Sequence, residues 1–309
     1  MESVYEYIYA VKSLGSFTKA ADHLHISQPA LSIAIKKLEQ ELNYAIFDRN
    51  TNPTTLTPAG EIILSHIEKI MLLESNTKAA LNDLDSMTSG RLMIGGTQYI
   101  TAFILPDIIF RFKEKYPQID IEFIESSSAN LADLLINNKI DLMFSVKSFD
   151  ASKFTFFKSF TDYLYVAIPK KLIGESLIKE YILTRQDVIS NLHEALRSIP
   201  SLEDLKSIPF LLLREGNNLY DRSKMLFEVE GISPPITMSL DQLTTAHYLC
   251  KSGMGATFTT GQLIKQIDDH ENLVYLKVDH PLMTRNFKIV VNKNRYRSNI
   301  MNAFIKEFQ

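Results

Sequence analysis

Cysteine is nearly absent from this sequence of 309 residues, which contains only Cys250. A single cysteine excludes a disulfide within the chain, and it argues against an oxidant sensor built on two cysteines of one subunit. Cys250 lies in the apolar pattern AHYLCKSG. We therefore expect its thiol to be packed in the core.

Long apolar runs are missing as well. No stretch approaches the roughly 18 uninterrupted apolar residues that a membrane-spanning helix needs. No basic segment followed by an apolar one begins the chain, as it would in a secretory signal. We therefore expect a soluble, cytoplasmic protein with no membrane partner.

Motifs of common enzymes are also lacking. The chain has neither a Gly-x-Ser-x-Gly elbow nor a Gly-x-x-x-x-Gly-Lys-Ser/Thr loop. Gly95-Gly96 lacks the further glycines and the lysine of a phosphate loop, and the histidines do not have the spacing of zinc ligands. We expect no enzymatic activity, no cofactor and no metal.

An excess of positive charge is absent too. The chain has 33 Lys and Arg against 36 Asp and Glu, for a formal net charge of −3, and the first sixty residues are slightly acidic. Domains that bind DNA are usually basic. Charge alone therefore does not favour a nucleic-acid partner.

Residues 16–49 are the most informative part of the chain. The segment TKAADHL predicts a short helix with Thr18 at its N-cap, and Ala20 and Ala21 are small enough for a second helix to cross closely. A turn at 25–27 follows, and Pro29 suits the start of the next helix.

The second helix has an apolar stripe and a polar stripe. The apolar residues recur at spacings of four, three and four: Leu31, Ile35, Leu38 and Leu42. Gln28, Ser32 and Lys36 form the polar stripe, with Lys37 beside it. Such a helix can read base edges from its N-terminal half while its lysines meet phosphate. The alternative is an amphipathic hairpin that binds nothing, because most such hairpins do not bind DNA.

The sequence GSFTKAADHLHISQPALSIAIKKLEQELNYAIFDR, followed by LTPAGE at 56–61, resembles the winged helix-turn-helix of the LysR-type transcriptional regulators. The resemblance runs continuously for about sixty residues in the family's order of elements. It departs at Ile33, where the family commonly has Arg. Ile33 would pack on a thymine methyl or contribute little. This difference should therefore affect which DNA sequence is recognised, and not whether DNA is bound.

The resemblance implies a role in binding double-stranded promoter DNA for three groups of residues. Those entering or flanking the major groove are Gln28, Pro29, Ser32, Ile33, Lys36 and Lys37. Those meeting phosphates at the first helix are Ser16, Thr18 and Lys19. Arg49 and Thr51–Thr55 would place the wing.

One long helix is predicted from Ala59 to about Met87, because no Gly or Pro interrupts the chain between Gly60 and Gly90. Its apolar heptad positions are Ile63, Ile67, Ile70, Leu81 and Leu84. The alternative is a helix that packs only on its own domain. The family resemblance implies an antiparallel pairing of two such linker helices in a homodimer, and a homotetramer is the family's usual state. Residues 88–90 are expected to form a hinge.

Strands and helices alternate after the hinge. We predict strands at 91–96, 119–124 and 141–146 and helices at 100–115 and 129–137, which together imply parallel βαβ units. Further strands are predicted at 154–160 and 163–169.

This half resembles the LysR-type effector domain, through GRLMIGG, ILPDIIFRFKEKYPQIDIEF, SSSANLADLLINNKIDLMF and GMGATF. The resemblance implies two α/β lobes, like a periplasmic binding protein. The first lobe would take 91–166 and 269–309, and the second 167–268. Residues 170–206 are longer than the family usually has there and suggest an insertion.

A ligand is expected beyond the carboxyl ends of the parallel strands, where helix N-termini present unpaired N–H groups. The polar residues at these places are Thr97, Gln98, Ser126, Ser127, Ser128 and Ser145. Arg214 and Thr257 are weaker candidates from the second lobe. Each Ser or Thr could equally serve as an ordinary helix cap.

The fold class that we expect is therefore α/β. A winged helix-turn-helix (1–60) would be followed by a linker helix with hinge (61–90) and a two-lobed, periplasmic-binding-protein-like effector domain (91–309). The function expected is a LysR-type regulator that responds to a small, anionic effector. The alternatives are a cytoplasmic small-molecule binding protein without site-specific DNA binding and an α/β enzyme.

Overall fold

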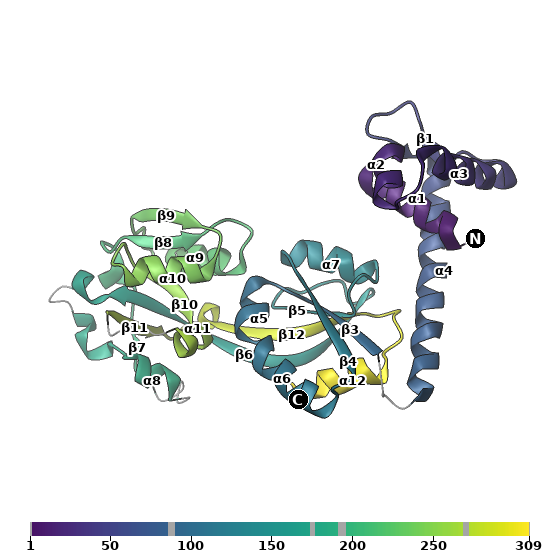
Figure 1. Cartoon of the computed structure of the whole chain (residues 1–309). Coiled ribbons are helices and arrows are strands. Elements are labelled where there is room, and N and C mark those ends of the chain that lie inside the picture. Colours follow the sequence, from purple (N-terminus) through teal and green to yellow (C-terminus); the bar gives the residue numbers. More distant parts are fainter. Residues whose placement is uncertain (1, 86–89, 174–176, 191–195, 268–271, 309) are drawn as a thin grey trace. The chain divides into compact units, whose positions relative to one another are not determined.

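The computed structural model describes residues 2–85, 90–173, 177–190, 196–267 and 272–308 (Figure 1). The chain divides into two compact units, residues 1–84 and 85–309. The predicted hinge lies mostly outside the described residues. No helix among the described residues is long and apolar enough to cross a membrane.

The first unit contains three short helices, a two-stranded wing and one long helix. The elements are α1 (Glu2–Leu14), α2 (Phe17–His23), α3 (Gln28–Leu42), β1 (Phe47–Asp48), β2 (Thr55–Leu56) and α4 (Pro58–Asn82). Strands β1 and β2 pair antiparallel. Leu31 and Ile35 of α3 are buried in the same core as Ile8 and Val11 of α1, and Leu38 packs against it. These three confirm the inward stripe predicted for α3, but its last member, Leu42, is 41% exposed.

The helix-turn-helix begins earlier than predicted. Ser16, not Thr18, is the N-cap of α2, and its hydroxyl accepts a hydrogen bond from the N–H of Lys19 at 3.4 Å. Phe17 is the first helical residue, and its ring meets Phe47 edge to face at 5.5 Å. Ser27 caps α3 in the same way, with Pro29 in the first turn as expected.

Gly60 is required where α4 passes close to the backbone of Ile46, just before β1. A Cβ on Gly60 would lie 2.0 Å from the carbonyl oxygen of Ile46, so no larger residue fits without moving the backbone. Thr57 caps α4, and its hydroxyl donates to the carbonyl of Ala45 at 2.6 Å. The wing is thus fixed to the start of α4.

The apolar residues of α4 divide between two faces. Leu64 and Ile67 are buried in the core of the first unit, and Ile63 packs against it. The prediction of a heptad face is therefore wrong at Ile67, whereas Ile63 is only partly buried. The other three predicted heptad positions are exposed, namely Ile70, Leu81 and, in the 3-10 helix η1 (Asp83–Asp85), Leu84, and so are Ile62 and Leu73. We call this set the α4 stripe.

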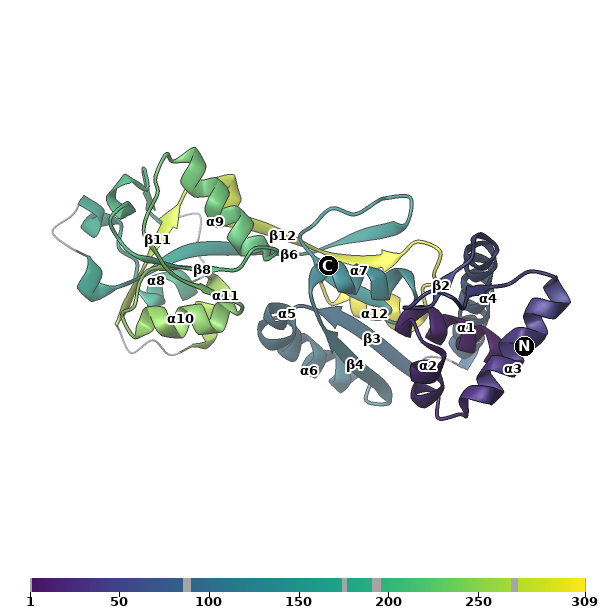
Figure 2. The same cartoon turned by 90° about the horizontal axis from the view of Figure 1, so that it is seen from above.

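The first lobe of the second unit is built on three parallel strands, as predicted. Strand β3 (Gly90–Gly96) pairs with β4 (Ile119–Glu125) and β5 (Leu142–Ser145). Helix α7 (Ser128–Ile136) covers one face of this sheet, and α6 (Leu105–Lys115) and α12 (Asn299–Lys306) cover the other (Figures 1 and 2). The carboxyl ends of the three strands therefore lie at one edge.

The predicted helix at 100–115 is divided into α5 (Gln98–Phe103) and α6. Pro106 lies in the first turn of α6 and has no N–H to continue a helix that began earlier. Proline also disfavours helical geometry in the residue before it. The division lets α5 begin directly after β3.

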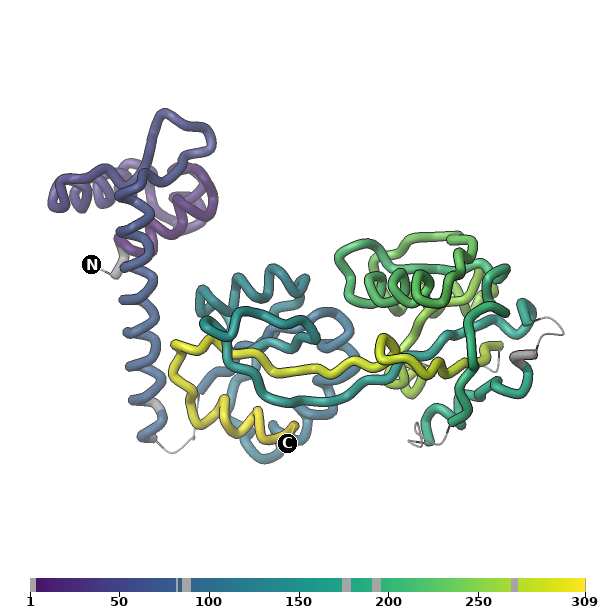
Figure 3. Tube along the Cα trace, turned by 180° about the vertical axis from the view of Figure 1, so that it is seen from behind, coloured from purple at the N-terminus to yellow at the C-terminus, as the bar shows by residue number. Residues whose placement is uncertain are grey.

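Strand β6 (Phe154–Pro169) is one strand of 16 residues where two had been predicted. Its first part pairs antiparallel with β12 (Thr284–Asn292), and its last part lies between β10 (Thr257–Thr260) and β11 (Leu273–Val278). Figure 3 shows the teal and yellow segments running side by side from one lobe to the other. The register of the β6–β12 pairing shifts between Asn286 and Lys288, where the two strands pass from one lobe to the other.

The second lobe surrounds the far end of β6. Strands β8 (Phe210–Leu213) and β9 (Ile236–Leu240) are parallel, and α9 (Asn218–Val229), α10 (Leu243–Lys251) and α11 (Gly261–Gln266) pack around them and β10. Strand β11 pairs with β6 at 166–169 and with β7 (Ser198–Ile199). It thus belongs with the second lobe, although we had assigned 269–309 to the first.

The long segment 170–206 contains short elements. They are the 3-10 helices η2 (Lys170–Leu172), η3 (Leu177–Tyr181) and η5 (Glu203–Leu205), with α8 (Arg185–Ile189) and β7. Residues 174–176 and 191–195 of this segment lie outside the described residues. Arg185 donates to the carbonyl oxygen of Ile264 at 2.9 Å and also to that of Lys265, which ties α8 to the end of α11.

Replacing Gly60 by alanine should lower the free energy of unfolding by about 1–3 kcal/mol, since the added methyl meets backbone that must shift. Urea denaturation of the full chain would measure the change. Ser65→Ala on the exposed face of α4 is the control. An unchanged midpoint for Gly60→Ala would contradict the close approach.

Candidate nucleic-acid interface and ligand cavity

Helix α3 presents an exposed face opposite its buried stripe. The exposed residues on it include Gln28, Pro29, Ile33, Lys36 and Lys37. Ile33 is 68% exposed, so no packing within the unit accounts for an apolar side chain at this position. The face offers an amide, an aliphatic group and two ammonium groups to a partner.

Arg49 joins the wing to α3. Its guanidinium donates to the hydroxyl of Ser32 at 3.2 Å and forms an ion pair with Glu39 at 3.1 Å. The same group lies over the ring of Phe17, 4.9 Å from its centroid. Ser32 and Arg49, which were both predicted to take part in DNA binding, are thus hydrogen-bonded to each other. These contacts of Arg49 fix the wing relative to α3.

The remaining residues expected at DNA lie around these elements. Thr51 holds the loop of the wing, because its hydroxyl donates to the carbonyl of Asp48 at 3.0 Å and accepts from the N–H of Thr55 at 3.1 Å. Thr18 and Lys19 are exposed on α2, whereas Ser16 uses its hydroxyl oxygen as a cap.

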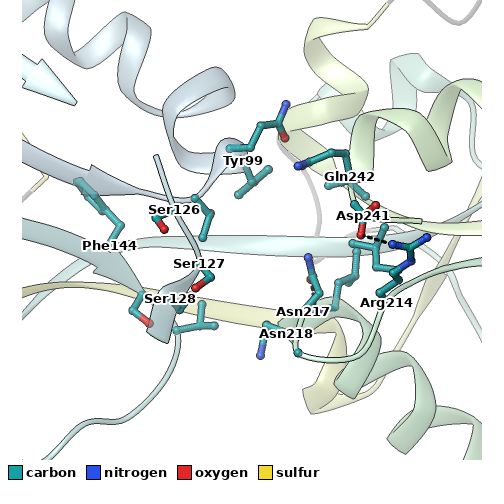
Figure 4. A pocket seen from close by; sticks show the side chains of 18 of the residues that line it. Tyr99, Ser126, Ser127, Ser128, Phe144, Arg214, Asn217, Asn218, Asp241 and Gln242 are labelled. Atoms are coloured by element: carbon teal, nitrogen blue, oxygen red, sulfur yellow. Dashed lines mark hydrogen bonds and ion pairs between the residues drawn. The ribbon is translucent and has the colours of Figure 1, made fainter. Parts of the chain in front are cut away.

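A cavity of about 420 Å³ lies between the two lobes of the second unit. Seven of the eight residues predicted for a ligand line it: Thr97, Gln98, Ser126, Ser127, Ser128, Ser145 and Arg214. Figure 4 shows the serines on one side and Arg214 with neighbouring polar residues on the other. Thr257 does not line the cavity, because it is buried and donates to the carbonyl of Leu211 at 2.9 Å.

The serine hydroxyls of the first lobe also serve as local caps. Ser127 accepts from the N–H of Asn130 at 3.3 Å, Ser126 from the side chain of the same residue, and Ser145 from the N–H of Lys147. A hydroxyl that accepts such a bond keeps its own proton to donate. Capping and ligand binding are therefore compatible at these three positions. Thr97 caps α5 without a side-chain hydrogen bond.

The second lobe supplies two asparagines that the sequence analysis missed. The amide oxygen of Asn217 accepts from the N–H of Leu219 at 2.9 Å, and that of Asn218 accepts from Nε of Arg222 at 3.1 Å. Both residues line the cavity, and both amides have their NH₂ groups left to donate. They follow β8 and begin α9, so the rule that we applied to the first lobe would have found them.

The helix starts around the cavity come from both lobes. Ser127 is the N-cap of α7, Asn217 of α9 and Gln242 of α10. These helices direct backbone N–H groups and the positive ends of their dipoles toward the same space. The cavity is thus rich in hydrogen-bond donors.

Charged side chains of both signs line the cavity. Arg214 pairs with Asp241 at 3.1 Å, and both are largely exposed (Figure 4). Glu125 accepts from the hydroxyl of Thr101 at 2.7 Å. Arg285, also missed by the sequence analysis, is buried beside Asp162 and Tyr99. Burial, and then the neighbouring Asp162, raise the pKa of the Tyr99 hydroxyl, which therefore stays protonated.

Two family models match the chain. Residues 4–61 match the bacterial regulatory helix-turn-helix of the lysR family, and residues 85–309 match the LysR substrate binding domain. Together they cover both units.

Similar proteins match over nearly their full length. A probable RuBisCO transcriptional regulator of Gracilaria tenuistipitata var. liui is 26% identical over 303 residues, covering 96% of this chain and 92% of that protein. The uncharacterized HTH-type transcriptional regulator YcgK of Bacillus subtilis (strain 168) is 25% identical, covering 98% and 92%.

Solved structures share the fold. A full-length OxyR variant from Pseudomonas aeruginosa has a TM-score of 0.69 at 22% identity, covering 100% of this chain and 94% of that one. Full-length CbnR complexed with its target DNA has a TM-score of 0.62 at 18% identity, covering 100% and 98%.

The buried thiol of Cys250 gives a prediction about redox chemistry. Burial raises the pKa of this thiol to about 12. Only roughly one part in ten thousand would be thiolate at pH 8, and thiolate is the reactive form. We expect a disulfide reagent such as DTNB to leave the native protein unmodified and to label one thiol per chain in guanidinium. Rapid labelling of the native protein would contradict a packed thiol.

Proposed function

The chain belongs to the LysR family of DNA-binding transcriptional regulators, and from this premise we propose a role for each of its two units. The first unit binds a specific site through α3 and the β1–β2 wing. A small anion in the cavity of the second unit governs that binding. The protein would act in the cytoplasm.

The exposed face of α3 supports the proposed DNA contact. Gln28 can pair with the edge of adenine, and Lys36 and Lys37 can meet phosphates. Ile33 suits the methyl group of thymine. Since Arg49 is committed to Ser32 and Glu39, we assign it to positioning the wing, the role that the family resemblance implied.

The α4 stripe supports a homodimer formed through the linker helix. Leu73 is 67% exposed and Leu84 77%, and a second copy of the helix would remove such side chains from water. A dimer would present two copies of α3 to two half-sites. A tetramer would pair two such dimers.

The donors around the cavity carry the proposal of an anionic effector. Three helix starts and the NH₂ groups of Asn217 and Asn218 converge there from two lobes. A ligand that contacts both lobes stabilises the arrangement of lobes that it binds best, and it can change DNA binding by its difference in affinity between the two states.

Gln28→Ala and Lys36→Ala should change DNA binding in different ways. Loss of the amide should reduce discrimination among operator variants by about 1–3 kcal/mol. Loss of the ammonium should weaken binding to all sequences and lower the salt slope by about one unit. Fluorescence anisotropy with the operator and single-base variants, over a salt series, measures both quantities. Identical profiles for the two variants would contradict these assignments.

Leu73→Glu should dissociate the protein by placing a charge in the proposed helix pairing, weakening self-association by about tenfold or more. Sedimentation velocity over a concentration series would show the shift toward monomer. Lys78→Glu, which also introduces an acid on exposed α4, is the control. Equal association of both variants would place the dimer contact elsewhere.

A further inference from the structure

Arg285 and Asp162 form a buried ion pair where the two lobes join. They lie directly opposite each other on β12 and β6, next to the register shift. Arg285 is 6% exposed and Asp162 2%. Nε of Arg285 lies 3.0 Å from Oδ2 of Asp162, and Nη2 donates to the same oxygen. One edge of the guanidinium is therefore closed by the carboxylate.

A second guanidinium lies near the same carboxylate. Arg222 of α9 is half-buried and donates to the carbonyl oxygens of Leu282 at 2.6 Å and Thr284 at 3.0 Å. Its third partner is the amide oxygen of Asn218. All three partners are uncharged, and burial, followed by Arg285, lowers the pKa of Arg222. Arginine nevertheless stays protonated in proteins.

The charges of this group do not cancel. Among the described residues, Asp162 is the only acid that acts on Arg222 and the only one paired with Arg285. Two guanidinium groups and one carboxylate leave an excess of one positive charge. This charge is shared by the half-buried Arg222 and the buried Arg285, and a bound anion would offset it.

The Nη1 side of the Arg285 guanidinium brings this positive charge to the cavity. Nη1 of Arg285 has no hydrogen-bond partner among the described residues, and Arg285 is part of the cavity lining. Its guanidinium lies over the rings of Tyr99 and Phe287, 4.8 and 5.1 Å from their centroids, and both rings also line the cavity. Aromatic rings that contact a guanidinium do not replace an anionic partner.

We propose that Arg285 binds the negative charge of the effector, and that the effector carries a single carboxylate. This inference rests on the proposed function and specifies the chemistry of the same cavity. Asp162 holds Arg285 in place, and Arg222 supplies the excess charge. A second carboxylate on the ligand would meet the acids of the lining, Glu125, Glu215 and Asp241, with only Arg214 to offset them.

The test compares acids with their uncharged amides. The probes are the straight-chain monocarboxylates from acetate to octanoate and benzoate, each with its primary amide and with a dicarboxylate of equal length. Binding to the full chain is measured by calorimetry. We expect the best acid to bind about tenfold or more tightly than its amide and more tightly than its dicarboxylate.

The double variant Asp162→Asn/Arg285→Gln removes both charges of the pair while keeping side chains of similar size. We expect it to fold and to lose most of the preference for the acid, because the ligand carboxylate then lacks its direct partner. Lys224→Gln, which removes an exposed charge from the same helix as Arg222, should keep the preference for the acid. This comparison separates recognition of charge from a general loss of structure.

Three results would overturn the inference. If the double variant keeps the preference for the acid, Arg285 does not bind the carboxylate, and the proposed function stands. Tighter binding of a dicarboxylate would overturn the single charge. If no acid of the series binds the wild-type chain, the anionic effector itself is overturned, and the role of Arg285 with it.

Discussion

The pairing of β6 with β12 at Asp162 and Arg285 is the constraint on which the second unit depends. These two strands link the lobes, so the cavity exists only because they hold the lobes facing each other. A charged pair in the middle of a strand costs desolvation energy, which a well-packed apolar pair would avoid. Because Arg285 also lines the cavity, the carboxylate that we propose it binds gives a functional reason for that cost.

In the first unit, too, single residues and elements make contacts on more than one side. Arg49 contacts Ser32, Glu39 and Phe17, and so fixes the wing on α3 while the outer face of α3 stays exposed. Helix α4 buries Leu64 and Ile67 in its own unit and leaves Leu73 and Leu81 exposed. One helix therefore serves two surfaces, the core of its unit and the stripe that we assign to a second copy.

Features set by neighbouring residues could be predicted from the sequence. Examples are the inward stripe of α3, the parallel strands β3 to β5 and the serines that follow them. Features set by distant residues could not. Strand β6 continues through Asp162 because Arg285, 123 residues away, neutralises the carboxylate. Thr257 was misplaced because its hydroxyl bonds to a distant carbonyl. The heptad pattern of α4 was correct only in part, because Ile67 is buried in its own unit while Ile70, Leu81 and Leu84 are exposed.

The most direct test of the central claim is footprinting of the purified full chain on the DNA flanking its own coding region, over a salt series. We expect protection across several helical turns, resistance to non-specific competitor DNA and a steep fall in affinity with salt. Weak binding that competitor DNA abolishes would contradict a regulator that recognises its site as a multimer through α3 and the wing.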